Sequence, residues 1–267
     1  MKTIAFSTNI LCVLLLLSTA AKAQIINVDK TDTLPYSNKA KWDGNIAAGI
    51  EIDKQNSTLY DATNLLDLSM QKKKILYILS ASDRFTYNGP QDFLNTGFAH
   101  FRLRYNYKAK LHPESFVQYQ WDAKIGIRHR FVAGENLRYN LLHHKQWEIT
   151  IATGLMYENE VWNYAGVDTS KLPAITTDVA THVIKSNNYL KLEGNLSPNS
   201  SLKLAVFYQA LFGSFFQPRI CTVGSFSVDA TKHFGISLTY SGIYDSKPIV
   251  PITKFYYTLS NSIVYKL

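Results

Sequence analysis

The feature that most constrains this chain is a strict alternation of apolar and polar residues between positions 98 and 131. Within 99–109, apolar residues occupy every second position, and charged residues such as His100 and Arg102 interleave with them. The same alternation returns over 117–128. Because successive side chains of a β-strand point to opposite faces, both segments are predicted to be strands with one apolar and one charged face.

Similar segments continue to the C-terminus. The predicted strands cover 42–53, 58–70, 75–87, 99–109, 117–128, 133–142, 147–160, 183–196, 202–216, 220–230, 234–244 and 255–267, with a tight link at 110–113. Many of them are longer than the five or six residues, roughly, of a typical globular strand. Long two-faced strands suit a sheet with lipid on one side and a polar interior on the other. We therefore predict an all-β fold, a transmembrane antiparallel up-and-down β-barrel of about 12 strands.

The N-terminus predicts export. Lys2 precedes an apolar run over 10–17 that is too short to span a bilayer as a helix, and Ala21-Lys22-Ala23 fits the small-x-small cleavage pattern. An uncleaved membrane anchor is the alternative interpretation of this segment. The predicted organisation is a Sec-type signal peptide at 1–23, a periplasmic lead-in at 24–41 and an outer-membrane β-barrel domain at 42–267.

Composition excludes several other classes. Cleavage would remove Cys12 and leave Cys221 alone, so neither an intramolecular disulfide nor a thiolate metal site is expected. Cleavage would also remove two of the 28 basic residues, leaving 26 against 20 acidic residues. This positive excess is scattered and accompanies no recognition motif, so we expect no nucleic-acid binding. Beyond the leader no run of about 18 apolar residues occurs, which argues against helical membrane spans.

The positions of the connections predict the orientation. The three longest predicted connections, 88–95, 163–182 and 245–254, follow the third, seventh and eleventh strands and therefore share one end of the sheet. Outer-membrane barrels place long loops outside and short turns in the periplasm, so both termini are predicted to be periplasmic. A soluble β-barrel or sandwich is the competing fold, because its strands alternate equally well. Strand length, the export signal and aromatic residues at strand ends favour the membrane version.

Four short motifs carry a family resemblance. They are FVQYQ (116–120), RFVAGENLRY (130–139), MYENE (156–160) and YDSKP (244–248). Through them the chain resembles the salt-induced outer-membrane proteins, a family defined by a domain of unknown function. The resemblance implies an outer-membrane β-barrel and carries over no catalytic residues.

Charged side chains are predicted to gather on the inner face, where they would line a pore. The residues expected there are His100, Arg102, Arg104, Lys108, Gln118, Gln120, Asp122, Lys124, Arg128, Arg130, Glu158, Glu160, Lys191 and Glu193. Acidic partners are also available at Glu51 and Asp53. Because an isolated buried charge is costly, we expect ion pairs across the interior. These pairs would form either a structural salt-bridge network or the basic, anion-favouring constriction of a narrow passive pore.

Two other functions stay open as alternatives. Ligand binding or adhesion would use outer loops, of which 163–182 is the best candidate. A lipid-modifying enzyme is less favoured, because His143 and His144 fall in a predicted periplasmic turn and no serine elbow or zinc His-Glu-x-x-His motif is present. Glu158 and Glu160 are interpreted as ion-pair partners rather than an acid–base pair.

The predicted location also defines the expected partners. They are outer-membrane lipid and lipopolysaccharide, the barrel-assembly machinery during insertion, and small solutes or ions. We predict an outer-membrane location in a Gram-negative cell, no cofactor and no metal site; the oligomeric state is left open.

Overall fold

A computed structural model describes residues 37–54, 58–88, 93–143, 146–231 and 234–265. The predicted signal peptide, its cleavage site and the first part of the predicted lead-in lie outside these residues, as do the terminal Leu267 and the turn residue His144.

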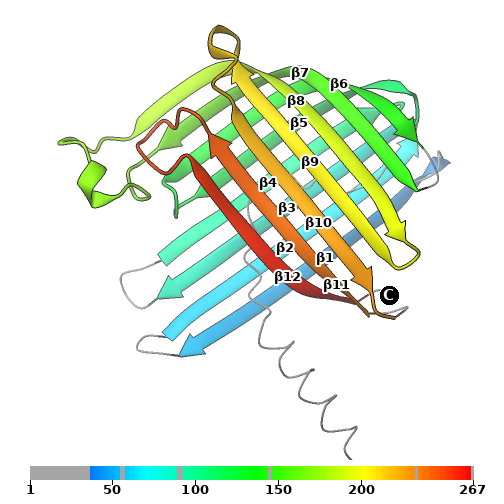
Figure 1. Cartoon of the computed structure of the whole chain (residues 1–267), viewed down its shortest axis with the longest axis horizontal. Helices are drawn as coiled ribbons and strands as arrows, with labels where there is room; N and C mark the ends of the chain where they lie inside the picture. Colours follow the sequence, from blue (N-terminus) through cyan, green and yellow to red (C-terminus); the bar gives the residue numbers. More distant parts are fainter. Residues whose placement is uncertain (1–36, 55–57, 89–92, 144–145, 232–233, 266–267) are drawn as a thin grey trace, which may run out of the picture.

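One antiparallel sheet contains all twelve strands, and each strand pairs with its neighbours in the sequence (Figure 1). The strands are β1 (Ser37–Lys54), β2 (Thr58–Lys73), β3 (Ile75–Asn88), β4 (Phe93–Tyr105), β5 (Leu111–Asp122), β6 (Ile127–His143), β7 (Trp147–Trp162), β8 (Val179–Ser197), β9 (Ser200–Leu211), β10 (Arg219–Asp229), β11 (Phe234–Asp245) and β12 (Phe255–Tyr265). The predicted all-β class, up-and-down order and strand number are confirmed.

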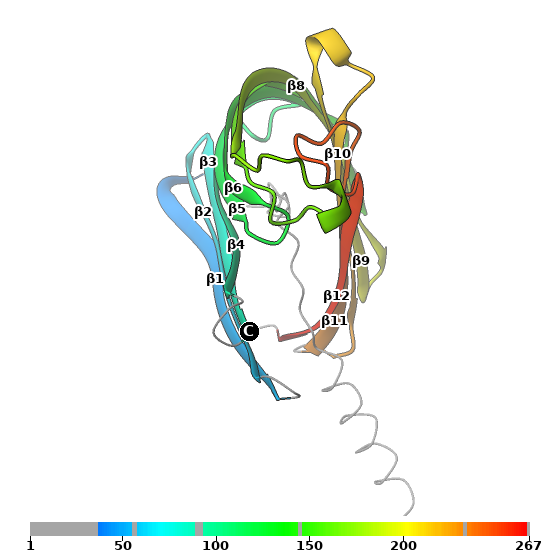
Figure 2. The same cartoon turned by 90° about the vertical axis from the view of Figure 1, so that its left-hand side faces the viewer.

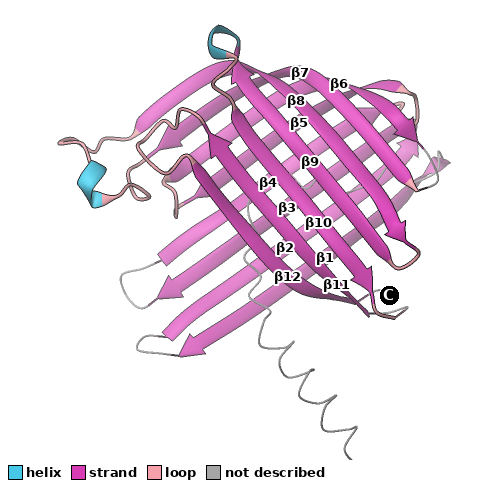
Figure 3. Ribbon diagram, in the orientation of Figure 1, coloured by secondary structure: helices cyan, strands magenta, loops and turns pink. Residues whose placement is uncertain are grey.

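Within the residues that the structure describes, helix is confined to two single turns, η1 (Thr169–Lys171) and η2 (Phe212–Ser214), which both lie in connections between strands (Figure 3). Among the described residues, no helix is long and apolar enough to cross a membrane.

The sheet is strongly curved, so that β1–β4 face β9–β12 across its concave side (Figure 2). Side chains from strands that are not neighbours meet on this side. Tyr189 of β8 donates to Glu114 of β5 at 3.0 Å, and Arg219 of β10 contacts Glu160 of β7 at 2.6 Å. The concave face is therefore a shared interior. Within the described residues, no ladder pairing joins β1 to β12.

The two faces of the sheet have an inverted polarity compared with a water-soluble protein, because polar side chains are buried and apolar side chains are exposed. On β5, His112, Glu114 and Gln118 are buried on the concave face, whereas Val117 and Tyr119 are exposed on the convex face. The period of two in the sequence produces this separation, because each step along a strand reverses the direction of the side chain. Most buried side chains are polar and lie beside small apolar clusters, whereas apolar side chains cover the outside.

The connection after β4 differs from the prediction. β4 ends at Tyr105 instead of continuing to position 109, and β5 begins at Leu111, so the predicted link at 110–113 is wrong. Asn106 turns the chain at a φ of 51° and donates its N–H to the Lys74 carbonyl oxygen. Asparagine tolerates this left-handed conformation better than most residues. Because the backbone turns at Asn106, the alternation of inward and outward side chains along β4 ends there. Tyr107 is buried and packs in an apolar cluster of the interior.

The fifth predicted strand also extends too far. β5 ends at Asp122, and the next strand starts at Ile127 after a turn that contains Gly126 with a φ of 88°. A Cβ at position 126 would lie 2.5 Å from the Asn163 carbonyl oxygen, so glycine is required here by both conformation and space. The apolar residues of this turn fall in phase with the alternation of the strand, so the pattern predicted a strand that continues through the turn.

Other boundaries also changed, among them the start of β6, which is at Ile127 where position 133 was predicted. β1 begins at Ser37, earlier than the predicted start at position 42, which shortens the predicted lead-in. β9 ends at Leu211, and η2 follows it, although the strand was predicted to reach position 216.

Candidate functional site

A continuous row of mostly polar residues crosses the interior face from β4 to β11. In pairing order the row contains Arg104, Glu114, Asn136, Gly154, Asn187, Gln209, Arg219 and Asp245. Each residue is the direct cross-strand partner of the next. Since directly opposed residues in a sheet share one face, the ladder aligns their side chains in a band around the interior.

Hydrogen bonds run along this band. Arg130 donates through Nη2 to Gln209 Oε1 at 3.3 Å, and Gln209 donates through Nε2 to Asn187 Oδ1 at 3.2 Å. Asn187 then donates to Asn136 Oδ1 at 3.1 Å, and Asn136 donates to Glu114 Oε1 at 3.2 Å. The amide groups thus join two clusters of charged side chains at either end of the relay.

The first cluster, the Glu114 cluster, consists of Arg102, Arg104, Glu114, Arg138 and Tyr189. Glu114 Oε2 lies 2.7 Å from Arg104 Nε, 3.2 Å from Arg102 Nη1 and 3.5 Å from Arg138 Nη1. Glu114 Oε1 accepts from the Tyr189 hydroxyl at 3.0 Å. All three guanidinium groups and the carboxylate are buried. Three cations therefore share the Glu114 carboxylate, and the cluster is basic.

The second cluster, the Glu158–Glu160 cluster, consists of Arg130, Glu158, Glu160, Lys185, Arg219 and Asp245. Arg130 lies 2.5 Å from Glu158 and 2.9 Å from Glu160. Arg219 bridges to both glutamates, at 3.1 and 2.6 Å.

Two further contacts complete this cluster. Arg219 lies 2.9 Å from Asp245, and Lys185 pairs with Glu158. Three basic and three acidic groups balance, as expected where burial makes an unpaired charge costly.

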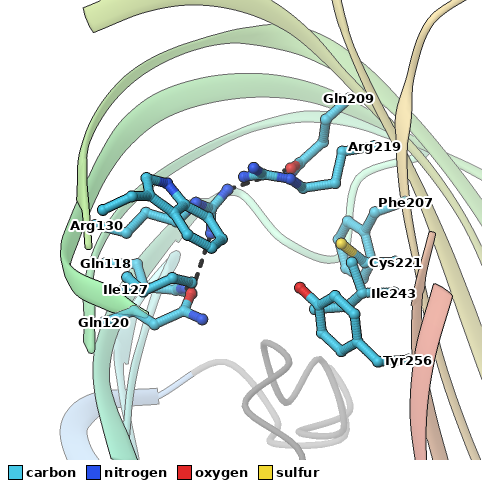
Figure 4. Close-up of a pocket in the computed structure, with 11 residues that line it drawn as sticks. Gln118, Gln120, Ile127, Arg130, Phe207, Gln209, Arg219, Cys221, Ile243 and Tyr256 are labelled. Atoms are coloured by element: carbon cyan, nitrogen blue, oxygen red, sulfur yellow. Dashed lines mark hydrogen bonds between the residues drawn. The ribbon is translucent and has the colours of Figure 1, made fainter. Parts of the chain in front are cut away.

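Little free volume separates these groups. A cavity of about 30 Å³ has Arg130 on one wall and Arg219 and Cys221 on the opposite wall (Figure 4). This volume has room for only one or two water molecules. A larger cavity of about 140 Å³ adjoins Lys185, Arg219 and Asp245. The arrangement can hold water and small ions at its charged walls.

Most predicted interior residues are found on the buried face. Arg102 Nε lies 3.2 Å from His100 Nε2, and Gln118 donates to Gln120, whose oxygen also accepts from Arg130. A separate buried pair joins Lys191 to Glu193 at 2.6 Å. These residues, together with Arg104, Arg130, Glu158 and Glu160, surround the same interior.

Other predicted interior residues lie elsewhere. Lys108 and Lys124 are exposed in turns, and Arg128 is exposed on β6, where it pairs with Asp178 at 2.8 Å. The prediction that these three residues face the interior is wrong. Lys108 and Lys124 lie in the turns at 106–110 and 123–126, outside the strands that were predicted to contain them. Arg128 is next to a β-bulge between Ile127 and His129, which interrupts the alternation before Arg130. Asp122 is half-buried at the end of β5 and accepts from the Lys124 N–H.

The sequence-based prediction missed several members of both clusters. They are Glu114, Arg138, Lys185, Tyr189, Arg219 and Asp245. Glu114 lies before the predicted start of the fifth strand at position 117, and Arg219 lies one position before the predicted start of the tenth strand at 220. Neither residue was therefore assigned to the interior face. The phase of Gln118 and Gln120, continued backwards by two-residue steps, leads to Glu114 and would have identified it.

Connections at one end of the sheet form a small apolar cluster of their own. Val167 from the β7–β8 connection and Val250 from the β11–β12 connection are buried against Ile127 and Trp162. The β7–β8 connection, which was predicted as the candidate for outside contacts, is thus anchored by the packing of Val167. In the same connection, hydrogen bonds from the Ser170 backbone and hydroxyl lower the pKa of the Asp168 carboxyl.

The described residues contain no cluster of three or more His, Cys, Asp or Glu side chains arranged to hold a metal ion. No protein-family model, curated protein or solved structure matches this chain. The resemblance to the salt-induced outer-membrane proteins stays a prediction.

Proposed function

We propose that this protein is an outer-membrane β-barrel whose interior is filled by an ion-pair network, with a structural role or, at most, that of a narrow passive pore. The observation that carries the proposal is the inverted polarity of the sheet. Charged residues such as Arg104, Glu114 and Glu160 are buried, whereas large apolar residues are exposed on the convex face of most strands. Lipid is the solvent for which this distribution is favourable.

The length of the strands fits a bilayer. On β5 the outward positions run from Leu111 to Trp121. At about 3.3 Å per residue this segment is about 33 Å long, and a tilt of about 40° reduces its height to about 25 Å. That height equals the apolar band of a typical outer-membrane barrel.

Aromatic side chains at the strand ends support the same proposal. Tyr208, Ile220, Tyr244 and Phe255 are consecutive cross-strand partners near the end of the sheet that carries the β7–β8 connection. Tyr60 and Tyr87 form another pair near that end, with ring centroids 6.1 Å apart. Such residues form the aromatic girdles at both interfaces of outer-membrane barrels.

The proposed orientation follows from the strand order. The start of β1 at Ser37 and the end of β12 at Tyr265 belong to the same end of an up-and-down sheet of twelve strands. This end would face the periplasm, and the long β7–β8 and β11–β12 connections would lie outside. Lipid and lipopolysaccharide would surround the convex face, and the barrel-assembly machinery would insert the chain.

The experiment is expression of the full chain with its own leader in a Gram-negative host, followed by membrane fractionation. We expect the protein in the outer-membrane fraction, with faster electrophoretic migration before heating than after it. Recovery as a soluble periplasmic monomer would refute the proposal. In planar bilayers, the filled interior predicts small conductance steps or none, and large stable steps would contradict the filled interior.

Loop-mediated binding is a second candidate, and the apolar cluster of Val167 and Val250 favours it. By fixing two connections against each other, this cluster gives the outer end a defined surface. Val250→Asp should release both connections, which increased proteolysis at 163–178 would detect. Unchanged proteolysis in the variant would contradict the role of the cluster in fixing the two connections.

A further inference from the structure

The β9–β10 connection is a short loop with two chemically different sides. Its phenylalanines Phe212, Phe215 and Phe216 are 62, 42 and 93% exposed. Its polar residues Ser214 and Gln217 instead line the cavity of about 140 Å³ beside Arg219. The loop contains η2 and extends beyond the end of the sheet (Figures 1 and 2).

Tyr208 shows which way the aromatic side points. Phe207 and Gln209, its neighbours on β9, both line the interior cavity of Figure 4. Because side chains alternate along a strand, Tyr208 between them points outward. Its ring lies 5.2 Å from the Phe215 ring, and its hydroxyl donates to the Phe215 carbonyl oxygen. The loop is thus tied to the convex face of the sheet.

The loop aromatics continue an outward row that is aromatic except for Ile220. Tyr208 is directly opposite Ile220, which is opposite Tyr244, and Tyr244 is opposite Phe255. Phe215 extends this row beyond the strand end, and Phe216 packs edge-on against it at 5.9 Å. A group of large apolar residues this exposed marks an interaction surface, and its continuity with the apolar convex face identifies lipid as the partner.

We propose that Phe212, Phe215 and Phe216 insert into the outer leaflet of the membrane, at the boundary between headgroups and acyl chains, and anchor this side of the barrel rim. The inference rests on the proposed function, since it requires the convex face to be in lipid. Aromatic rings favour this boundary, while Ser214 and Gln217 keep contact with the aqueous interior.

Three single-cysteine variants of the full chain, each in a Cys221→Ser background, test the anchor. Phe216→Cys probes the loop, Leu155→Cys probes the convex face of β7, and Ile175→Cys probes an exposed apolar position of the β7–β8 connection. Each protein is labelled with an environment-sensitive fluorophore and placed in phosphatidylcholine vesicles that contain lipids brominated at shallow or deep acyl positions. We expect shallow bromines to quench the label at 216, deep bromines to quench the label at 155, and neither to quench the label at 175.

Each other outcome overturns the inference in a distinguishable way. Quenching at 155 without quenching at 216 would reject the anchor and leave the membrane proposal standing. No quenching at either position would reject both. A label at 216 that is protected from every lipid and crosslinks to a second copy would assign the loop to self-association instead.

Discussion

Asn187 Nδ2 donates a hydrogen bond to Asn136 Oδ1 at 3.1 Å, although these residues lie on β8 and β6, with β7 between them. The residue of β7 in the same register row is Gly154. Because glycine has no side chain, the two amides meet across it. This contact continues the relay that links the Glu114 cluster to the Glu158–Glu160 cluster.

Gly154→Ala should destabilise the fold. A Cβ at this position would lie 1.9 Å from the Glu135 carbonyl oxygen and 2.5 Å from Asn136 Oδ1. Overpacking of this kind costs about 1–3 kcal/mol. The midpoint of urea unfolding in detergent micelles, followed by the heat-dependent gel shift, measures the loss.

Gly224→Ala is the matched control for this variant. A Cβ at position 224 of β10 would approach other atoms no closer than 3.5 Å, which is an ordinary contact. Its unfolding midpoint should equal that of the wild type. Equal midpoints for Gly154→Ala and the wild type would contradict the proposed need for glycine in the relay.

Arg219→Met should unfold the protein at a lower denaturant concentration. It leaves Glu158, Glu160 and Asp245 short of one cation in a buried site, and breaking such a pair costs about 3–5 kcal/mol. Arg128→Met provides the control, because the Arg128 side chain is 57% exposed beside Asp178. Exposed pairs contribute only about 0–1 kcal/mol. Similar losses in both variants would mean that the interior cluster contributes no more than a surface pair.

The double variant Glu160→Ala/Arg219→Ala should raise the conductance of single molecules in planar bilayers. It removes one acid and one base together and enlarges the space between Arg130 and Cys221, where the free volume is about 30 Å³. Glu158 keeps Arg130 and Lys185 as partners. A folded double variant with wild-type conductance would show that another part of the interior limits passage.

A membrane-inserted sheet should close between β1 and β12. An open edge would leave backbone N–H and C=O groups unpaired in hydrocarbon, at a cost of several kcal/mol each, roughly. Cysteines at Ile50 and Tyr257, both exposed near the same end of the sheet, should join within one chain through a short bis-maleimide.

The control for closure pairs Ile50→Cys with Leu155→Cys on β7, far from β1 in the strand order. This pair should react with single maleimides without forming an internal crosslink. If the Ile50–Tyr257 pair behaves in the same way, closure between β1 and β12 is refuted.

The strand number and the polarity of each face could be predicted from the sequence, because both depend on a local property. A period of two assigns each side chain to a face without knowledge of any partner, and it placed Arg102, Gln118 and Glu158 correctly. Turn positions were harder. Tyr107 and Ile125 are apolar and maintained the alternation, so the left-handed conformations of Asn106 and Gly126 were not visible in the pattern.

The amino-acid sequence by itself determined that this chain forms long two-faced strands in an up-and-down order. Only the tertiary structure decided which charges meet. Arg219 contacts Glu160, which lies 59 residues away in the sequence, because the register of β7 to β10 and the curvature of the sheet bring the two side chains together. A shift of one residue in any pairing would turn the following side chains to the opposite face. Burial favours a register that gives these charges partners, as it does for the balanced Glu158–Glu160 cluster, and that register depends on all the strands together.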